Sequence, residues 1–273
     1  RAIRARDRQA VAPRMALDTA TVAALYRYPV KGLSADGLDT ADLTPGAPMP
    51  FDRAFAIENG ARRFDPEKPR PLPKISFLML MRNERLATLR SRFDEPTTTL
   101  SIARAGKDVV RGDLTTKLGR QTLEQFFAAY MKDDLRGAPR IVSAPGHAFA
   151  DVGQACLHIV NRASIADLER VTGRPIDPLR FRANVYLDGL PAWQELAWLD
   201  RQITIGADAR LDVFARTQRC EATNVDPATG ARDSAIPRQL QRAYGHADMG
   251  VYARVSRAGT IRTGDEVALS PHR

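Results

Sequence analysis

Residues 216–230 have the sequence RTQRCEATNVDPATG, in which a lone cysteine stands beside arginines and just ahead of an Asp-Pro-x-Thr-Gly turn. The cysteine is Cys220, and Arg219 directly precedes it. Nearby cations favour the thiolate, which is the form of cysteine that binds a soft metal or attacks an electrophile. The stretch therefore predicts a loop that carries a metal-binding or reactive sulfur.

The length and charge of the chain set wider limits. Its 273 residues are enough for one large or two modest domains, and 44% of them are apolar, as in an ordinary globular protein. Lys and Arg number 41 against 32 Asp and Glu, a net charge of +9, of which residues 1–14 supply +4. We interpret residues 1–14 as a disordered leader; a mitochondrial-type transit segment is the weaker alternative, because serine and a clear apolar face are missing. The remaining charge suits an anionic ligand as well as it suits nucleic acid.

The two cysteines, Cys156 and Cys220, lie far apart and form no CxxC spacing. A disulfide framework is therefore disfavoured, and a reducing compartment is expected. Two thiols are too few for an iron–sulfur cluster of the usual four-thiolate type, so a redox reaction would need electrons from another protein. Cys156 lies in an apolar run and is interpreted as structural. No apolar run approaches the roughly 18 residues of a membrane span, and none is predicted.

Strands dominate the prediction for the first half of the chain. Apolar or alternating runs predict them at residues 22–30, 51–57, 75–82 and 98–103. One apolar stripe at helical spacing predicts a core-facing helix, formed by Leu123, Phe126, Phe127 and Tyr130. A polar break at residues 133–139 precedes a further strand at residues 140–143. We place a domain boundary near residue 145.

The second half mixes strands with a helix. Strands are predicted at residues 156–160, 203–205, 211–214, 249–255 and 267–269. Ser164 and Asp167 match the S-x-x-D pattern of a helix start. Residues 181–187 alternate strictly, which predicts a strand with Arg182 and Asn184 on one face. The whole chain is therefore predicted to be an α+β protein of two closely packed, strand-rich units.

Several polar residues are candidates for binding an anion. Arg182 offers a fork of donors and Asn184 an amide that both donates and accepts, a pair suited to a polar heterocycle with phosphate, such as a pterin. Lys31 stands in a turn with Gly32, where a lysine can bind phosphate as a point charge. The alternatives are a solvated strand face for the first pair and an exposed loop lysine for the second.

For two further candidates, Arg53 and Ser164, a purely structural role is the alternative to anion binding. Arg53 stands on an otherwise apolar strand face and must meet an anion or the end of the sheet, unless it pairs with Asp52 beside it. Ser164 stands at a helix start, where free N–H groups receive phosphate, unless it only caps the helix.

Other classes of site lack support. The four histidines show no HxxxH or HExxH spacing, which disfavours a zinc hydrolase. Walker A, GxGxxG and GxSxG patterns are missing, so nucleotide-dependent and nucleophile-elbow readings have no basis. An aromatic-basic RNA-binding motif is missing too, and no nucleic acid partner is expected.

Five segments in order resemble the MOSC family, named for the C-terminal domain of molybdenum cofactor sulfurases. They are YPVKG (28–32), FDRAF (51–55), ASIADL (163–168), RFRAN (180–184), and RCE (219–221) with DPATG (226–230). Each segment alone is weak, but their order and spacing cover about residues 20–270. The nearest branch contains the mitochondrial amidoxime-reducing components and their bacterial relatives. In place of a serine seen in some members, this chain has Gly32.

The resemblance implies a fold and a cofactor. The fold would be a MOSC N-terminal β-barrel domain at residues 15–145 packed on a MOSC domain at residues 146–273. The cofactor would be the molybdenum cofactor, with Cys220 as the metal ligand. Positions that match its phosphate and pterin contacts, or that flank the metal ligand, are Lys31, Arg53, Ser164, Arg182, Asn184, Gln218 and Arg219.

The implied function is molybdenum-dependent reduction of small N-hydroxylated compounds, such as amidoximes and N-hydroxy bases, in a bacterial cytoplasm. Electrons would come from an external protein of the ferredoxin, cytochrome b5 or flavin reductase type. The alternative is a molybdenum cofactor carrier or sulfur-transfer protein, in which Cys220 carries a persulfide.

Overall fold

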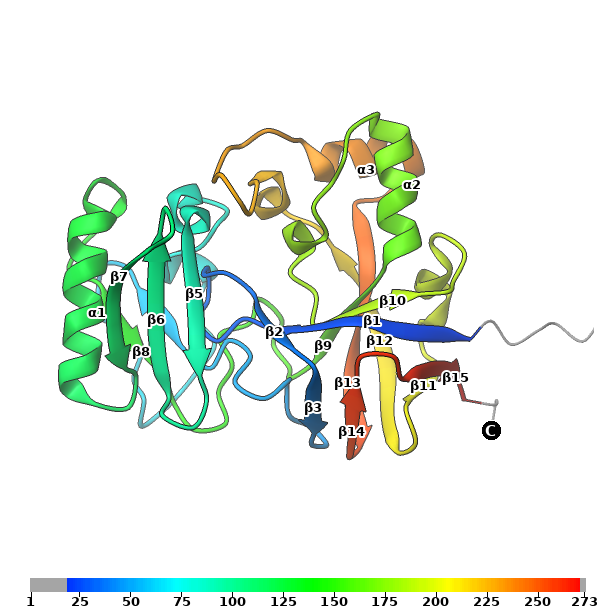
Figure 1. Ribbon diagram of the computed structural model, residues 1–273, viewed down its shortest axis with the longest axis horizontal. Coiled ribbons are helices and arrows are strands. Elements are labelled where there is room, and N and C mark those ends of the chain that lie inside the picture. Colours follow the sequence, from blue (N-terminus) through cyan, green and yellow to red (C-terminus); the bar gives the residue numbers. More distant parts are fainter. Residues whose placement is uncertain (1–18, 271–273) are drawn as a thin grey trace, which may run out of the picture.

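The computed structural model describes residues 19–270, which form two adjoining strand-rich units (Figure 1). In the larger unit, an eight-stranded sheet closes on itself because β1 pairs with both β15 and β10; β2 (Asp36–Leu38) extends it beside β1. The seven strands of this barrel are, in spatial order, β10 (Val185–Asp188), β9 (Leu157–Asn161), β13 (Asp248–Arg257), β12 (Ala209–Gln218), β11 (Gln202–Ile205), β15 (Glu266–Leu269) and β1 (Ala20–Arg27).

The smaller unit is built on an antiparallel three-stranded sheet covered by one helix. The sheet consists of β5 (Leu89–Asp94), β6 (Thr99–Arg104) and β7 (Lys107–Asp113), and the helix is α1 (Lys117–Tyr130). Leu123 and Phe127 of α1 are fully buried in the core of this unit, which confirms the predicted apolar stripe. A two-stranded sheet of β4 (Ala56–Glu58) and β8 (Arg140–Val142) belongs to the same unit.

The remaining strands and helices pack on the barrel or lie in the connecting segments. A two-stranded sheet joins β3 (Thr40–Leu43) to β14 (Gly259–Arg262), and helices α2 (Arg162–Thr172) and α3 (Ile236–Tyr244) share a core with the outer face of the barrel. Short 3-10 helices occur at η1 (Lys74–Ser76), η2 (Glu84–Thr88), η3 (Lys132–Asp134), η4 (Pro178–Phe181), η5 (Gln194–Trp198) and η6 (Glu221–Asn224). The predicted strand-rich α+β fold is confirmed.

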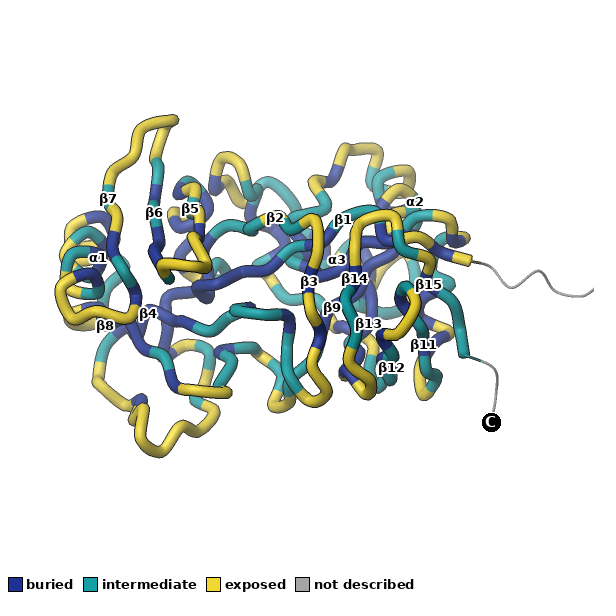
Figure 2. The backbone as a smooth tube through the Cα atoms, turned by 60° about the horizontal axis from the view of Figure 1, so that its bottom comes forward, coloured by how far each residue is buried: buried dark blue, intermediate teal, exposed yellow. Residues whose placement is uncertain are grey.

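The two units are interleaved along the chain. Strand β1, at the start of the described chain, pairs with β10 and β15 from the second half and so forms part of the barrel. Residues 27–33 then run, buried throughout, from the barrel into the smaller unit (Figure 2). This buried crossing brings residues next to β1 to the junction of the two units. The domain boundary near residue 145 stays a prediction.

Three predicted strands are wrong in part or in whole, because turns interrupt them. Phe51 and Arg53 have φ angles of 60° and 51°, so residues 51–53 form a turn and the strand is confined to β4. Residues 74–76 form η1, and no strand follows at 77–82. The alternating run at 181–187 begins with the end of η4, and Arg182 has a φ of 53°, so its strand is confined to β10.

The predicted helix start is displaced. Helix α2 begins at Arg162, and its N-cap is Asn161, whose side-chain oxygen accepts a hydrogen bond from the Ala163 amide. Ser164 therefore lies inside the first turn and does not cap the helix, because the earlier asparagine provides the acceptor.

Two further predictions from the sequence concern residues 1–14 and the lack of a membrane span. The predicted leader, residues 1–14, lies outside the described residues. None of the helices between residues 19 and 270 is long and apolar enough to cross a membrane.

Candidate functional site

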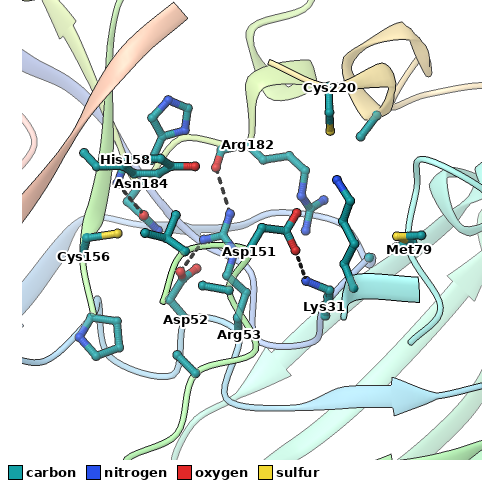
Figure 3. A pocket seen from close by; sticks show the side chains of 18 of the residues that line it. Lys31, Asp52, Arg53, Met79, Asp151, Cys156, His158, Arg182, Asn184 and Cys220 are labelled. Atoms are coloured by element: carbon teal, nitrogen blue, oxygen red, sulfur yellow. Dashed lines mark hydrogen bonds and ion pairs between the residues drawn. The ribbon is translucent and has the colours of Figure 1, made fainter. Parts of the chain in front are cut away.

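A cavity lies at the junction of the two units, and both halves of the chain line it (Figure 3). We call it the cationic cavity, because its walls carry the charged groups of Lys31, Arg53, Arg182 and Arg219. Cys220 stands at its edge with its sulfur turned toward the guanidinium of Arg182 (Figure 3). The structure thus brings together residues that are up to 189 positions apart, between Lys31 and Cys220.

Lys31 reaches the cavity from the buried crossing after β1. Its side-chain ammonium donates to the Phe149 carbonyl at 2.9 Å and forms an ion pair with Asp151 at 2.5 Å. Burial lowers the pKa of Lys31, and the Asp151 carboxylate opposes that shift only in part. The carboxylate therefore occupies the place where an external anion would meet this lysine.

The backbone conformation and the close neighbours of residue 32 explain why this chain has a glycine there. Its φ is +86°, and a Cβ there would lie 3.1 Å from both the Leu78 carbonyl oxygen and a methyl carbon of Leu86. A side chain at this position would be strained by the backbone and crowded by its neighbours. Any anion contact at residue 32 must come from the main chain.

Arg53 combines the two roles that the sequence left open. Its guanidinium pairs with Asp52 and also donates to the Arg182 carbonyl at 3.1 Å, while it lines the cavity. Burial disfavours its charge, but Asp52 outweighs that cost and raises the pKa of Arg53. Asp52 is itself fixed by a hydrogen bond from the Tyr28 amide at 2.8 Å. The predicted Asp–Arg pair exists, and it holds Arg53 at the cavity wall.

Arg182 is a half-buried cation without an anionic partner in the described part of the chain. Its guanidinium donates to the Leu33 carbonyl at 2.7 Å and lies 4.2 Å from the centroid of the Tyr28 ring. Among residues 19–270, no carboxylate forms a salt bridge with it. Burial, followed by repulsion from Arg53, lowers the pKa of Arg182 to about 10. An anion in the cavity would relieve this uncompensated charge.

Arg219 carries a second unsatisfied group. One terminal nitrogen donates to the Phe181 carbonyl at 2.7 Å, but its Nε is buried and has no partner in the described chain. His158 lies 3.4 Å from another terminal nitrogen, and burial together with Arg219 holds the pKa of His158 well below its ordinary value. The imidazole is therefore neutral at pH 7, and the positive charge of this wall belongs to the arginine.

Two more of the predicted site residues, Cys220 and Asn184, also line the cavity. Cys220 is a half-buried free thiol at the start of η6, and its carbonyl accepts from the Thr223 amide and hydroxyl at 3.1 and 2.9 Å. Asn184 is buried. Its side-chain oxygen accepts from the backbone N–H of His158 at 3.0 Å, and its side-chain nitrogen donates to the Tyr26 carbonyl at 3.2 Å. Asn184 thus shapes the wall, while Cys220 is a free cysteine among the residues that the structure describes.

Ser164 and Gln218 do not line this cavity. The Ser164 hydroxyl is fully buried, lies 2.8 Å from a carboxylate oxygen of Glu195, and accepts from the Trp193 amide at 2.8 Å. Gln218 ends β12 as an exposed residue, in register with Asp248. Ser164 is turned away from the cavity because its hydroxyl donates to the carboxylate of Glu195. The cofactor contact predicted for Ser164 therefore has no support in this geometry.

Part of the cavity lining is not predicted from the sequence. The added residues include Lys74, Met79, Asp151 and Tyr252, and Cys156 lies across the cavity from Cys220 (Figure 3). Burial raises the pKa of the Cys156 thiol to about 12, so it stays protonated. No local pattern marks Lys74 or Asp151, because Lys74 begins the short helix η1, Asp151 lies in an irregular segment, and the placement of both depends on long-range packing.

Two family models match the chain over most of its length. One is described as the MOSC N-terminal beta barrel domain and matches residues 19–135; the other is described as the MOSC domain and matches residues 139–268. The second match contains Arg182, Arg219 and Cys220, and the first contains Lys31 and Arg53.

Relatives match a shorter part of the chain. Mitochondrial amidoxime reducing component 2 of Rattus norvegicus is 28% identical over 123 residues, which are 41% of this chain and 36% of that protein. Mitochondrial amidoxime-reducing component 1 of Mus musculus is 30% identical over 41% of this chain and 35% of that protein. A molybdenum cofactor sulfurase of Drosophila pseudoobscura is 33% identical over 44% of this chain and 14% of that protein. The matches thus span about a third or less of each relative.

Solved structures with a similar chain course include the YuaD protein of Bacillus subtilis. It has 16% sequence identity and a TM-score of 0.43 over 93% of this chain and 97% of that chain. YiiM from Geobacillus stearothermophilus has 23% identity and a TM-score of 0.34 over 42% of this chain and 54% of that chain.

Proposed function

We propose that this chain, which belongs to the MOSC-domain family, is an oxidoreductase. It would bind a molybdenum cofactor in the cationic cavity and reduce N-hydroxylated compounds. One observation carries the proposal. Cys220 and Arg182 line the same cavity, and within residues 19–270 the cysteine is a free thiol and the half-buried arginine has no carboxylate partner. Such a wall suits a ligand that joins a soft metal to an anionic group.

The residues present fit that cofactor. Cys220 would hold the metal, because a thiolate is a soft ligand. Lys31, Arg53 and Arg182 would bind the anionic part, and the unpartnered Nε of Arg219 offers one further donor. When bound, the cofactor would supply a two-electron redox centre.

The protein supplies position and charge around that centre. Reduction of an N–OH group to N–H consumes two electrons and two protons and releases water. The electrons would come from an external protein of the ferredoxin, cytochrome b5 or flavin reductase type. Arg219 stands next to Cys220 and adds positive charge to the same wall of the cavity. The neutral imidazole of His158 leaves the cavity charge constant near pH 7.

Metal analysis of paired cysteine variants tests the proposal. Protein made in cells with an intact cofactor supply should contain molybdenum and should reduce benzamidoxime with a chemical electron donor. Cys220→Ser should lose molybdenum and turnover, whereas Cys156→Ser should keep its molybdenum content because Cys156 lies across the cavity (Figure 3). Full molybdenum content and activity in Cys220→Ser would refute the assignment of the metal ligand.

A second function is favoured by the match to a molybdenum cofactor sulfurase. In that case Cys220, half-buried at the cavity edge, would carry a persulfide or hold the cofactor for transfer. A carrier would release sulfur or cofactor stoichiometrically, whereas an enzyme would turn over. Cyanide-labile sulfur on Cys220, together with failure to reduce any N–OH compound, would favour the carrier. A cytoplasmic location stays a prediction for either function.

A further inference from the structure

The segment that carries Cys220 belongs to the larger unit but extends onto the smaller one. We call residues 220–233 the Cys220 segment; it contains η6 and ends shortly before α3. In Figure 1 the stretch that precedes α3 reaches out toward the smaller unit. The contacts of this segment therefore decide where Cys220 stands relative to the cationic cavity, which both units line.

Bonds inside the larger unit give the segment a definite shape. The carboxylate of Asp226 accepts from the amides of Ala228 and Thr229 at 2.8 and 2.7 Å. The Asp226 amide donates to the Ala231 carbonyl at 2.8 Å, and its carboxylate also pairs with Arg180 at 2.9 Å. These bonds order the loop, so a contact made by its outer end also constrains its start.

Arg232 ties this loop to the smaller unit. Its Nη2 donates to the carbonyls of Leu80 at 3.3 Å and Met81 at 2.5 Å, and it lies 3.2 Å from the Glu84 carboxylate. Its Nη1 donates to the Glu221 carbonyl at 3.4 Å. Glu221 directly follows the proposed metal ligand, and both Leu80 and Met81 line the cationic cavity. One guanidinium thus joins the neighbour of the metal ligand to the wall that the smaller unit contributes.

Arg90 makes a second tie in the opposite direction. It lies in β5 of the smaller unit and donates to the carbonyls of Pro227 at 2.7 Å and Ala228 at 3.3 Å. Between the two ties the backbones are close, because a Cβ at Gly230 would lie 3.0 Å from the Glu84 carbonyl oxygen. Two arginines, one from each unit, therefore clasp the Cys220 segment against η2.

The exposure of both arginines argues against a mainly stabilising role. The side chain of Arg232 is 34% exposed and that of its ion-pair partner Glu84 is 41% exposed, and a pair of this kind contributes little to stability. Arg90 is exposed, and no carboxylate pairs with it among residues 19–270. The main effect of these contacts should therefore be on the place of the loop.

We propose that Arg232 and Arg90 are positioning residues, which clasp the Cys220 segment against the smaller unit and so hold the Cys220 sulfur at the edge of the cationic cavity. The inference rests on the proposed function, in which Cys220 binds the metal, and it adds the residues that orient this ligand. Loss of a group that orients a metal ligand without touching the metal typically changes metal affinity or activity by about 10- to 100-fold. The junction of the two units is thereby part of the site.

A nitroxide spin label on Cys220 tests the clasp without any cofactor. The full chain carries Cys156→Ser as a common background, so that the label reacts at Cys220 alone. In Arg232→Met the EPR spectrum should show about twice as much mobile label or more, because a loop with fewer contacts opens more readily. Arg232→Lys should restore most of the immobile label, since an ammonium can donate to the same carbonyls.

Arg92→Met is the matched control for this measurement. Arg92 is exposed two residues along β5 from Arg90, and its side chain forms no ion pair or hydrogen bond in the described part of the chain. Unchanged label mobility in both Arg232→Met and Arg90→Met would overturn the clasp, and so would an equal rise in Arg92→Met. If Arg232→Met does not fold, Arg90→Met alone decides. A lower urea midpoint with unchanged mobility would assign the two arginines to stability.

Retention of molybdenum separates this inference from the proposed function. In protein made with an intact cofactor supply, Arg232→Met should lose molybdenum during dialysis about tenfold faster than the wild type and Arg92→Met, with recovery in Arg232→Lys. Equal retention in Arg232→Met and the wild type would overturn the positioning role and leave Cys220 as the ligand. A wild type without molybdenum would refute the proposed function, and the label on Cys220 would still decide whether the clasp exists.

Discussion

Arg180 and Arg182 stand two residues apart in the sequence, and their charges have opposite surroundings. Arg180 is held between two carboxylates, those of Asp226 and Asp233. Arg182 rests on the Tyr28 ring and a backbone carbonyl, without a carboxylate partner in the described chain. The charge of Arg180 is therefore compensated, and that of Arg182 is spare. Of these two arginines, Arg182 is therefore the one whose charge is available to a ligand.

The largest expected effect is on stability, at Arg180. Its side chain is only 5% exposed, and Arg180→Met would strand the carboxylates of Asp226 and Asp233, which are 21% and 32% exposed. We expect the free energy of unfolding to fall by about 3 kcal/mol, as when one partner of a buried ion pair is removed. Urea denaturation measures this change.

The matched control for that variant is Arg254→Met. Arg254 is 52% exposed and lies 3.8 Å from Asp212, so its loss should cost less than about 0.5 kcal/mol. Equal losses at Arg180 and Arg254 would break the distinction between a structural ion pair and an ordinary surface one.

Arg182→Met should act on ligand binding and leave stability nearly unchanged. The substitution removes a half-buried charge that has no carboxylate partner among residues 19–270, so the free energy of unfolding should change by no more than about 1 kcal/mol. The loss of one charge-assisted hydrogen bond should weaken binding of the cofactor by about 10- to 100-fold. Molybdenum content and the affinity for inorganic phosphate, measured by titration calorimetry, report the two sides of this prediction. A large loss of stability with unchanged binding would assign Arg182 to the structure alone.

The pH dependence of stability should reveal the neutral imidazole of the cationic cavity. The folded protein holds the pKa of His158 well below 6.5, whereas the unfolded chain takes up a proton near the ordinary value. The unfolded state therefore binds more protons below about pH 6.5, and stability should fall as the pH drops, by up to about 1.4 kcal/mol per unit from this group. In His158→Gln this part of the slope between pH 6.5 and 5 should disappear. An identical slope in variant and wild type would contradict a neutral His158.

The smallest expected effect concerns the carboxylate that competes for Lys31. Asp151 is 49% exposed, so its ion pair with Lys31 is worth only about 0.2–1 kcal/mol. Asp151→Asn should therefore raise the affinity for inorganic phosphate by no more than about fivefold. Asp133→Asn, at an exposed position in η3, is the control and should have no effect. A weaker affinity in Asp151→Asn would show that Asp151 positions Lys31 and does not compete with the anion.

Local sequence patterns predicted part of the regular elements and nominated the candidate residues. The stripe at residues 123–130 encoded α1, the apolar runs of the second half encoded most barrel strands, and the ordered segments around Lys31, Arg182 and Cys220 indicated the family. These features depend on local periodicity and on residue type, which the sequence states directly.

Only the tertiary structure decided which candidates meet and which charges remain unpaired. Arg182 faces the cavity from a left-handed turn and not from a strand, and Ser164 turns inward to Glu195. Asp226 and Asp233 neutralise Arg180 from 46 and 53 residues away. Pairing of this kind depends on long-range packing, which no local pattern records. For that reason the sequence could nominate the basic residues of the site, but it could not tell a spare charge from a satisfied one.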